Sequence, residues 1–231
     1  MSDPKRLVLA DPLSAEGVAI LEETGAIKVE DLSSLPREEL KRRLVGSAGL
    51  VVRSRTRADR ELIEAAEGLE VIGRAGVGTD NIDLDAATRR GVAVLNAPAG
   101  NTLSTAELTF GLLLTTARGI AEADRSMHEL RWDRGRIRGT QLSGKTLGVV
   151  GLGRIGTLTA ARARAFGMRI LAHGGFRDPP APTVAELEVE WMPLDDLLAR
   201  ADFVTCHVPL TDATRNLFNY DRFARMKPGA M

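Results

Sequence analysis

The chain of 231 residues is long enough for one large domain or two small ones. Its 31 basic and 31 acidic residues balance, so the overall charge indicates neither a nucleic-acid partner nor a membrane partner. The single cysteine, Cys206, excludes an intrachain disulfide. Together with the lack of a signal-peptide pattern and of a membrane-spanning apolar run, this predicts a cytoplasmic protein.

Residues 1–99 alternate between short apolar runs typical of strands and runs with helical spacing. The predicted strands cover 6–10, 27–30, 49–53, 70–74 and 92–96. The predicted helices cover 14–24, 36–44, 59–66 and 83–90. This alternation predicts parallel βαβ units, because connections of this length do not suit an antiparallel meander.

The pattern then changes to that of a single long helix. Ser104 and Glu107 have the spacing of a capping box, and apolar residues recur at helical intervals from there to about Leu130. We therefore predict one helix over 103–130 that joins two α/β domains. A polar stretch that contains glycine, 133–145, leads into the second block.

The second block repeats the alternation of strands and helices. Its predicted strands cover 147–151, 168–172, 188–191 and 202–206. Its predicted helices cover 154–166, 194–200 and 219–226. The final residues, MKPGAM, have the pattern of a turn into another strand. Because a doubly wound nucleotide-binding domain usually has six strands, we expect the second domain to be incomplete in this chain.

The stretch LGVVGLGRIG places Gly151, Gly153 and Gly156 at G-x-G-x-x-G spacing between an apolar strand and a helix. In such a turn the first glycine permits the tight bend, the second lets backbone approach a pyrophosphate, and the third lets helix and strand pack closely. The helix N-terminus offers N–H groups and a partial positive charge to the phosphates. A glycine-rich turn without a ligand is the alternative, but the setting favours dinucleotide binding.

Three longer stretches, NIDLDAATRRGVAVLNAPAGNTLSTAEL, LSGKTLGVVGLGRIG and ADFVTCHVPLTDATRNL, resemble the D-isomer-specific 2-hydroxyacid dehydrogenases. The resemblance covers essentially the whole chain. It implies an α/β fold of two Rossmann-like, doubly wound parallel-sheet domains joined by a long helix, with the second domain incomplete. It assigns residues 1–99 to the first part of a substrate-binding (catalytic) domain and residues 100–231 to a truncated NAD(P)-binding domain.

The resemblance also implies an oxidoreductase that moves a hydride between nicotinamide and a D-2-hydroxyacid, with NAD as the cofactor. The stretches LVVRSRT and VIGRAGVGTDNID are most similar to the members that oxidise 3-phosphoglycerate to 3-phosphohydroxypyruvate in serine biosynthesis. Two alternatives stay open. One is a glyoxylate or hydroxypyruvate reductase, and the other is a non-catalytic dinucleotide-binding protein similar to the family's corepressors.

Arg53 and Arg74 lie at the carboxyl ends of two predicted strands, where open α/β sheets bind ligands. Two guanidinium groups there suit a phosphorylated, carboxylated substrate, because arginine binds such oxygens in bidentate fashion. In the family, the residues that match them contact substrate. Solvated loop arginines are the alternative interpretation, and it is the favoured one for Arg55 and Arg57.

The loop AGVG contains Gly76, Val77 and Gly78, and its successive N–H groups suit an anion nest. In the family, that loop holds the substrate carboxylate, and Val77 is also a candidate cofactor contact. Asn101 and Ser104 lie at the start of the predicted long helix. We expect them near the substrate, although a plain capping role explains them equally well.

The resemblance places Arg154 and Ile155 of the glycine turn beside the cofactor. It places Val208 and Pro209, after the last complete strand, beside the cofactor as well. His207 precedes them, and we interpret it as a packing residue rather than a catalytic base.

The acid that usually binds the adenosine ribose is missing from its position. Counted from the glycine turn, that position falls on Gly174, where the family usually has Asp. Arg177 on the same loop, assisted by His173, is suited to a 2′-phosphate, so we expect NADP to be tolerated. Asp178 is an alternative acceptor for the ribose hydroxyls.

In the family, an Arg, an acidic residue (Glu) and a His carry out the chemistry, and all three follow the position that matches Met231. We therefore expect no catalytic residue, no metal ligand and no turnover from residues 1–231 alone. The expected partners are a small-molecule hydroxyacid and further copies of the chain in a homodimer or homotetramer. The helix predicted over 103–130 and the segment around Trp132 resemble the family's dimerisation region.

Overall fold

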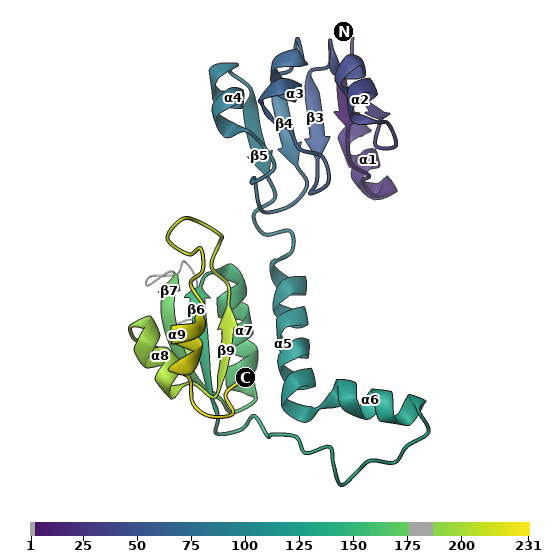
Figure 1. The fold of residues 1–231 in the computed structure, drawn as a ribbon. Coiled ribbons are helices and arrows are strands. Elements are labelled where there is room, and N and C mark those ends of the chain that lie inside the picture. Colours follow the sequence, from purple (N-terminus) through teal and green to yellow (C-terminus); the bar gives the residue numbers. More distant parts are fainter. Residues whose placement is uncertain (1–2, 176–186) are drawn as a thin grey trace. The chain divides into compact units, whose positions relative to one another are not determined.

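The computed structural model describes residues 3–175 and 187–231 (Figure 1). The chain divides into two compact units, Met1–Asn101 and Thr102–Met231. Each unit is built around a parallel sheet of its own, with five and four strands among the described residues. The predicted fold class, with Rossmann-like parallel sheets, is confirmed.

The sheet of the first unit has the strand order β2-β1-β3-β4-β5. Its strands are β1 (Lys5–Leu9), β2 (Ile27–Asp31), β3 (Gly49–Val52), β4 (Val71–Arg74) and β5 (Ala93–Asn96). Its helices are α1 (Ala15–Glu22), α2 (Arg37–Leu44), α3 (Arg60–Ala65) and α4 (Leu84–Arg89). Chain order runs outward from β1 in both directions, so the topological switch point lies between β1 and β3.

Both faces of this sheet are covered, because side chains alternate between the two sides of an extended strand. Val8 and Leu50 belong to a core on one side, which also contains buried residues of α2, α3 and α4. Leu9 and Val51 belong to a core on the other side, against which Val18 of α1 packs. Two covered faces are what a parallel sheet requires, and they leave its carboxyl edge as the place for a ligand.

Aspartate side chains cap the N-termini of two of the helices. Asp59 accepts a hydrogen bond from Leu62 N (3.1 Å) at the start of α3, and Asp83 accepts one from Ala86 N (2.8 Å) at the start of α4. Each carboxylate satisfies an N–H group that has no acceptor within its helix. These caps set the points at which the chain leaves the carboxyl-edge loops and returns along the sheet.

The sheet of the second unit has the strand order β8-β7-β6-β9. Its strands are β6 (Thr146–Leu152), β7 (Arg169–Gly175), β8 (Glu190–Trp191) and β9 (Phe203–Cys206). Its helices are α5 (Thr102–Arg118), α6 (Ile120–His128), α7 (Arg154–Ala165), α8 (Leu194–Arg200) and α9 (Tyr220–Ala224). Residues of α5 and α7 share a core on one face of the sheet, and residues of α8 pack on the other. The switch point of this sheet lies between β6 and β9.

The prediction of one helix over 103–130 is wrong. The structure has two helices, α5 and α6, separated by Gly119, whose φ of 62° lies in the left-handed region. A residue in that conformation ends an α-helix, although the apolar spacing continues across it. The predicted capping box is wrong as well, because α5 begins at Thr102 and Ser104 lies inside its first turn.

The last residue extends the second sheet. Val204 N donates to Met231 O (2.8 Å), and Met231 N donates to Asp202 O (3.0 Å). This pattern is that of a parallel ladder along β9. It agrees with the prediction that MKPGAM leads into a further strand.

A pair of glycine substitutions tests the break between α5 and α6. Gly119→Ala forces a side chain into the left-handed region and toward Ile137, 3.2 Å away. We expect it to lower the free energy of unfolding by about 1–2 kcal/mol. Gly111→Ala, inside α5 with open space around it, is the matched control. We expect it to raise that free energy by about 0.5–1 kcal/mol, as measured by urea unfolding. Stabilisation by both substitutions would contradict a break at Gly119.

Candidate functional site

The glycine turn connects the central strand of the second sheet to α7. Every residue of β6 is buried, and Gly151 near its end has a φ of 94°, which only glycine adopts readily. Gly153 N donates to Gly151 O (2.9 Å), which closes the turn, and Gly153 is the N-cap of α7. The backbone is consistent with the tight turn predicted at Gly151, and the predicted approach of a pyrophosphate at Gly153 stays a prediction.

The turn has no room for side chains at its first and third glycines. A Cβ on Gly156 would overlap the carbonyl oxygen of Gly151. A Cβ on Gly151 would lie 2.8 Å from Val208 Cγ1 and 2.9 Å from the carbonyl carbon of His207. The turn thus packs directly against the segment that follows β9, at the switch point of this sheet.

The start of α7 offers hydrogen-bond donors at the same place. The first helical bond runs from Thr157 N to Gly153 O (2.9 Å). The N–H groups of Arg154, Ile155 and Gly156 precede it and have no acceptor inside the helix. These donors, the helix dipole and the exposed Arg154 side chain together suit the pyrophosphate of a dinucleotide. The residues present therefore fit such a cofactor.

The position predicted to read the adenosine ribose, Gly174, lies on the neighbouring strand β7. The register pairs Val150 with His173 and Leu152 with Gly175, which places Gly174 beside the first glycine of the turn. A Cβ at Gly174 would meet nothing within 4 Å, although the φ of 66° is left-handed. Gly175 is different, because its Cβ would lie 2.5 Å from Leu152 N. Sequence reasoning singled out Gly174 and missed that the close approach of the two strands requires Gly175.

The other predicted contacts of the adenosine end are only partly described. The His173 ring is fixed by a hydrogen bond between Nδ1 and the backbone oxygen of Met192 (3.1 Å). Arg177 and the alternative acceptor Asp178 lie outside the described residues. Pro209 follows Val208 directly and is exposed.

His207 has the surroundings of a packing residue. Its backbone N–H donates to Val150 O (2.8 Å), and its Nε2 lies 2.9 Å from the hydroxyl of Thr205. Burial lowers the pKa of the imidazole below its ordinary value. The lowered pKa favours the neutral ring, and the packing role of His207 stays a prediction.

Arg53 and Arg74 lie on adjacent strands at the carboxyl edge of the first sheet. Arg74 ends β4, and Val52, the residue before Arg53, pairs with it. Among the described residues, neither guanidinium has a recorded hydrogen bond or ion pair, and Arg74 Nε is buried without a partner. A buried N–H donor without an acceptor is costly, so it favours an anionic ligand at this arginine.

The loop after β4 differs from the predicted anion nest. No residue from 75 to 78 has a positive φ, whereas a nest alternates right-handed and left-handed residues. Gly76 N donates instead to Arg74 O (2.7 Å). A Cβ at Gly76 would overlap the Arg74 guanidinium, so the side chain of Arg74 lies directly against this glycine. The loop therefore supports the arginine rather than forming a nest of its own.

The same loop is tied to the end of β5. Ala97 N donates to Gly76 O (2.9 Å), and Asn96 Nδ2 donates to Val77 O (2.7 Å). Gly78 follows, and a Cβ there would lie 2.7 Å from a carboxylate oxygen of Asp80.

Two predicted polar residues stand at the division between the units. Asn101 is the last residue of the first unit, and Ser104 belongs to the first turn of α5.

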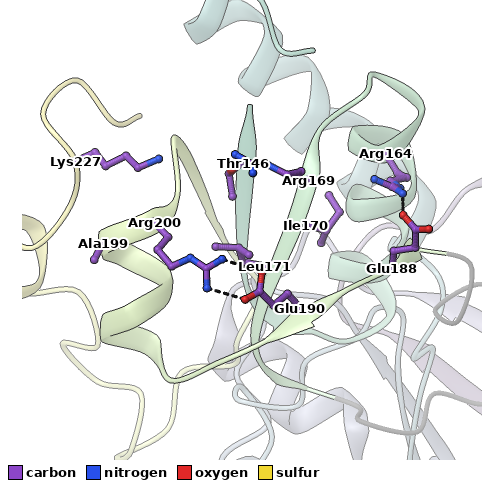
Figure 2. A pocket seen from close by; sticks show the side chains of 10 residues that line it. All are labelled: Thr146, Arg164, Arg169, Ile170, Leu171, Glu188, Glu190, Ala199, Arg200 and Lys227. Carbon is purple, nitrogen blue, oxygen red and sulfur yellow. Dashed lines mark hydrogen bonds and ion pairs between the residues drawn. The ribbon is translucent and has the colours of Figure 1, made fainter. Parts of the chain in front are cut away.

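A cavity of about 520 Å³ lies at the amino edge of the second sheet, opposite the edge that carries the glycine turn (Figure 2). Thr146 and Arg169, which begin β6 and β7, line it, so it belongs to the amino ends of the strands. Arg200 bridges both carboxylate oxygens of Glu190 (2.6 and 2.9 Å) across it. Ligands of open α/β sheets bind at the carboxyl ends instead, so this cavity is not the dinucleotide site.

The described part of the chain has neither a metal-binding cluster nor a membrane-spanning helix. It contains no group of three or more His, Cys, Asp or Glu residues that could hold a metal ion. Within it, no helix is both long enough and apolar enough to cross a membrane.

Comparison with known proteins identifies relatives of the chain. Residues 110–231 match the family model described as D-isomer specific 2-hydroxyacid dehydrogenase, NAD binding domain. The chain is 47% identical over 229 residues to the D-3-phosphoglycerate dehydrogenase of Methanocaldococcus jannaschii. That match covers 98% of this chain and 43% of the relative, so the chain spans less than half the length of this curated protein.

Solved structures share the fold. The TT0316 protein of Thermus thermophilus is 38% identical, with a TM-score of 0.85 over 97% of this chain and 71% of that one. The D-lactate dehydrogenase of Aquifex aeolicus, solved with NAD and lactic acid, is 28% identical, with a TM-score of 0.79 over 96% and 66%.

A methyl group at the third glycine tests the turn. In Gly156→Ala, the added carbon must push the carbonyl of Gly151 aside, so we expect NAD binding to weaken by about tenfold or more. Gly135→Ala is the control, because it adds a methyl group in open space within the same unit. Calorimetric titration with NAD measures both variants. Unchanged affinity in Gly156→Ala would contradict a cofactor site at this turn.

The lowered pKa of His207 can be tested by measuring how the stability of the chain depends on pH. Its pKa is lowered in the folded chain, so its contribution to stability is present above the ordinary value of 6.5 and is lost as the pH falls through the folded pKa. We expect the free energy of unfolding to fall more steeply between about pH 7 and pH 5 in the unmodified chain than in His207→Gln. NMR titration of the ring gives the pKa directly. A value above 6.5 would overturn this assignment.

Proposed function

This chain belongs to the D-isomer specific 2-hydroxyacid dehydrogenase family, and we propose that it provides the cofactor-binding and substrate-binding framework of an NAD-dependent dehydrogenase for 3-phosphoglycerate. The observation that carries the substrate proposal is the pair Arg53 and Arg74. Both guanidinium groups lie at one sheet edge and lack a recorded partner among the described residues. A substrate with a carboxylate and a phosphate supplies anions for both.

The proposed reaction converts the hydroxyl carbon of 3-phosphoglycerate to the ketone of 3-phosphohydroxypyruvate, with the hydride leaving from carbon and the hydroxyl proton released to solvent. When bound, NAD supplies the hydride acceptor. The chain's own residues bind and orient the two molecules. The first turn of α7 holds the pyrophosphate, Gly151 and Gly156 keep the backbone close to it, and the arginines orient the substrate by its anionic ends.

We propose that the cofactor site also accepts NADP. An acid at the ribose-reading position would repel a 2′-phosphate, and Gly174 carries no charge and leaves the space around its α-carbon open.

We further propose that the protein acts as a homodimer or a higher homo-oligomer. The arm formed by α6 and residues 129–137 leaves large apolar side chains exposed, including Leu130 at 95% and Trp132 at 76%. In the second unit, α6 extends away from the sheet (Figure 1). Large apolar side chains that gather in one patch mark protein interfaces, and these two lie within one short arm. A second copy of the same arm offers a matching surface.

Removal of one guanidinium tests the substrate proposal in the protein at its natural length. We expect Arg74→Ala to reduce kcat/KM for 3-phosphoglycerate by roughly 30- to 150-fold, equivalent to about 2–3 kcal/mol. The loss for D-lactate, which has no phosphate, is expected to be much smaller. Arg89→Ala removes the same charge from the last turn of α4, at the opposite edge of the same sheet, and serves as the control. Equal losses for both substrates in Arg74→Ala would contradict the assignment.

A substitution at Gly174 tests cofactor selection. Gly174→Asp places a carboxylate where it accepts from the ribose hydroxyls and repels a 2′-phosphate. We expect the NAD/NADP preference to rise by about tenfold, or about 1.4 kcal/mol. Gly174→Asn has nearly the same shape and the same left-handed backbone without the charge, so it separates electrostatics from strain. Tight NAD binding with rejection of NADP in the unmodified protein would show that another residue reads the ribose.

A further inference from the structure

The loop after β3 is held by a buried carboxylate that comes from a different strand. Asp11 follows β1 at the switch point of the first sheet and is only 1% exposed. One of its oxygens, Oδ2, accepts from Arg53 N (2.6 Å) and Thr56 N (3.1 Å). The other, Oδ1, accepts from the Thr56 hydroxyl (2.7 Å) and from Arg55 Nε (3.1 Å). All these donors belong to one four-residue loop, 53–56.

Asn81 holds two residues of this loop by their carbonyl groups. Its Nδ2 donates to Arg53 O (2.7 Å) and to Thr56 O (2.6 Å). Asp11 therefore binds the N–H groups of Arg53 and Thr56, and Asn81 binds their C=O groups. Every backbone polar group at the two ends of the loop has a side-chain partner from another part of the unit.

The loop that carries Asn81 is itself fastened to the chain just after Thr56. Ala58 N donates to Asn81 O (2.9 Å), and Asp83 N donates to Ala58 O (2.9 Å). These two backbone hydrogen bonds fix the position of Asn81 independently of the hydrogen bonds that its side chain makes. The bonds around loop 53–56 form one connected network, and such a network fixes geometry more firmly than separate bonds do.

The Asp11 carboxylate pairs with one of the two arginines in this loop, Arg55, and not with the guanidinium of the other, Arg53. Arg55 is exposed, but it forms an ion pair with Asp11 and donates to Ala10 O (2.9 Å), so its charge has a partner within the unit. The Arg53 guanidinium has no recorded partner among the described residues. The loop therefore presents one neutralised arginine and one whose charge is left for a ligand.

We propose that Asp11 and Asn81 are positioning residues that hold loop 53–56 in its ligand-binding conformation, with the Arg53 backbone fixed before an anionic substrate arrives. The inference deepens the proposed function and rests on it. A loop that is already ordered does not lose conformational entropy when the ligand binds, so fixing it strengthens binding. A burial cost for the Asp11 carboxylate is offset by its four donors.

The test measures 3-phosphoglycerate binding to the protein at its natural length by calorimetry, with NAD present. Asn81→Ala removes both bonds to the carbonyl groups, and we expect the Kd to rise by about tenfold. Asp11→Asn is the second variant, since it keeps the shape of a buried side chain and loses acceptor capacity. Asp59→Asn is the control. It removes another carboxylate of the same unit that binds an arginine and a backbone N–H but has no recorded bond to loop 53–56.

A double-mutant cycle separates positioning from general support of the fold. In an Arg53→Ala background, Asn81→Ala is expected to change the Kd by less than about twofold, because the group that it positions is gone. A tenfold effect that persists in that background would overturn the inference, as would an unchanged Kd in Asn81→Ala. If the unmodified protein at its natural length does not bind 3-phosphoglycerate, the proposed function and this inference both fail. Binding that Asn81→Ala leaves intact refutes the inference alone.

Discussion

The cofactor site of the second unit depends on one steric constraint, the lack of room for a side chain between the first and third glycines of the turn. A carbon added to Gly156 would displace the carbonyl of Gly151, and a carbon added to Gly151 would meet His207 and Val208. The end of β6, the start of α7 and the segment after β9 therefore lie in direct contact. That contact directs the first N–H groups of α7 toward the switch point between β6 and β9, where this fold binds a pyrophosphate.

The first unit fixes its carboxyl-edge loops with hydrogen bonds rather than with glycine packing. The side chains of Asp11 and Asn81 bind the two ends of the loop after β3, and Arg74 rests against Gly76 in the loop after β4. Both solutions have the same energetic consequence, since the backbone that meets a ligand is ordered when the chain folds rather than when the ligand binds. The chain belongs to a family whose model describes an NAD-binding domain.

Local patterns predicted most of the fold, and contacts between distant residues account for what they missed. Strands and helices follow from apolar periodicity, and the glycine turn follows from residues within one short stretch. The break at Gly119 depends on a left-handed φ that the apolar spacing does not encode. Gly76 was assigned to a nest because the role of its neighbour Arg74 is visible only in three dimensions. Asp11 drew no attention because its hydrogen-bond partners lie 42 to 45 residues further along the chain. The ribose-reading loop around Arg177 remains a prediction from sequence.

We expect the cofactor at the carboxyl edge of the second sheet, at the contact between the glycine turn and the segment after β9. Backbone amide NMR spectra of the chain, recorded during a titration with NAD, would locate it residue by residue. We expect the largest shifts on residues 151–156 and 207–209, with a smaller response at Gly174. Shifts centred instead on the amino-edge residues Thr146, Arg169 and Arg200 would place the ligand in the cavity of Figure 2 and contradict this expectation.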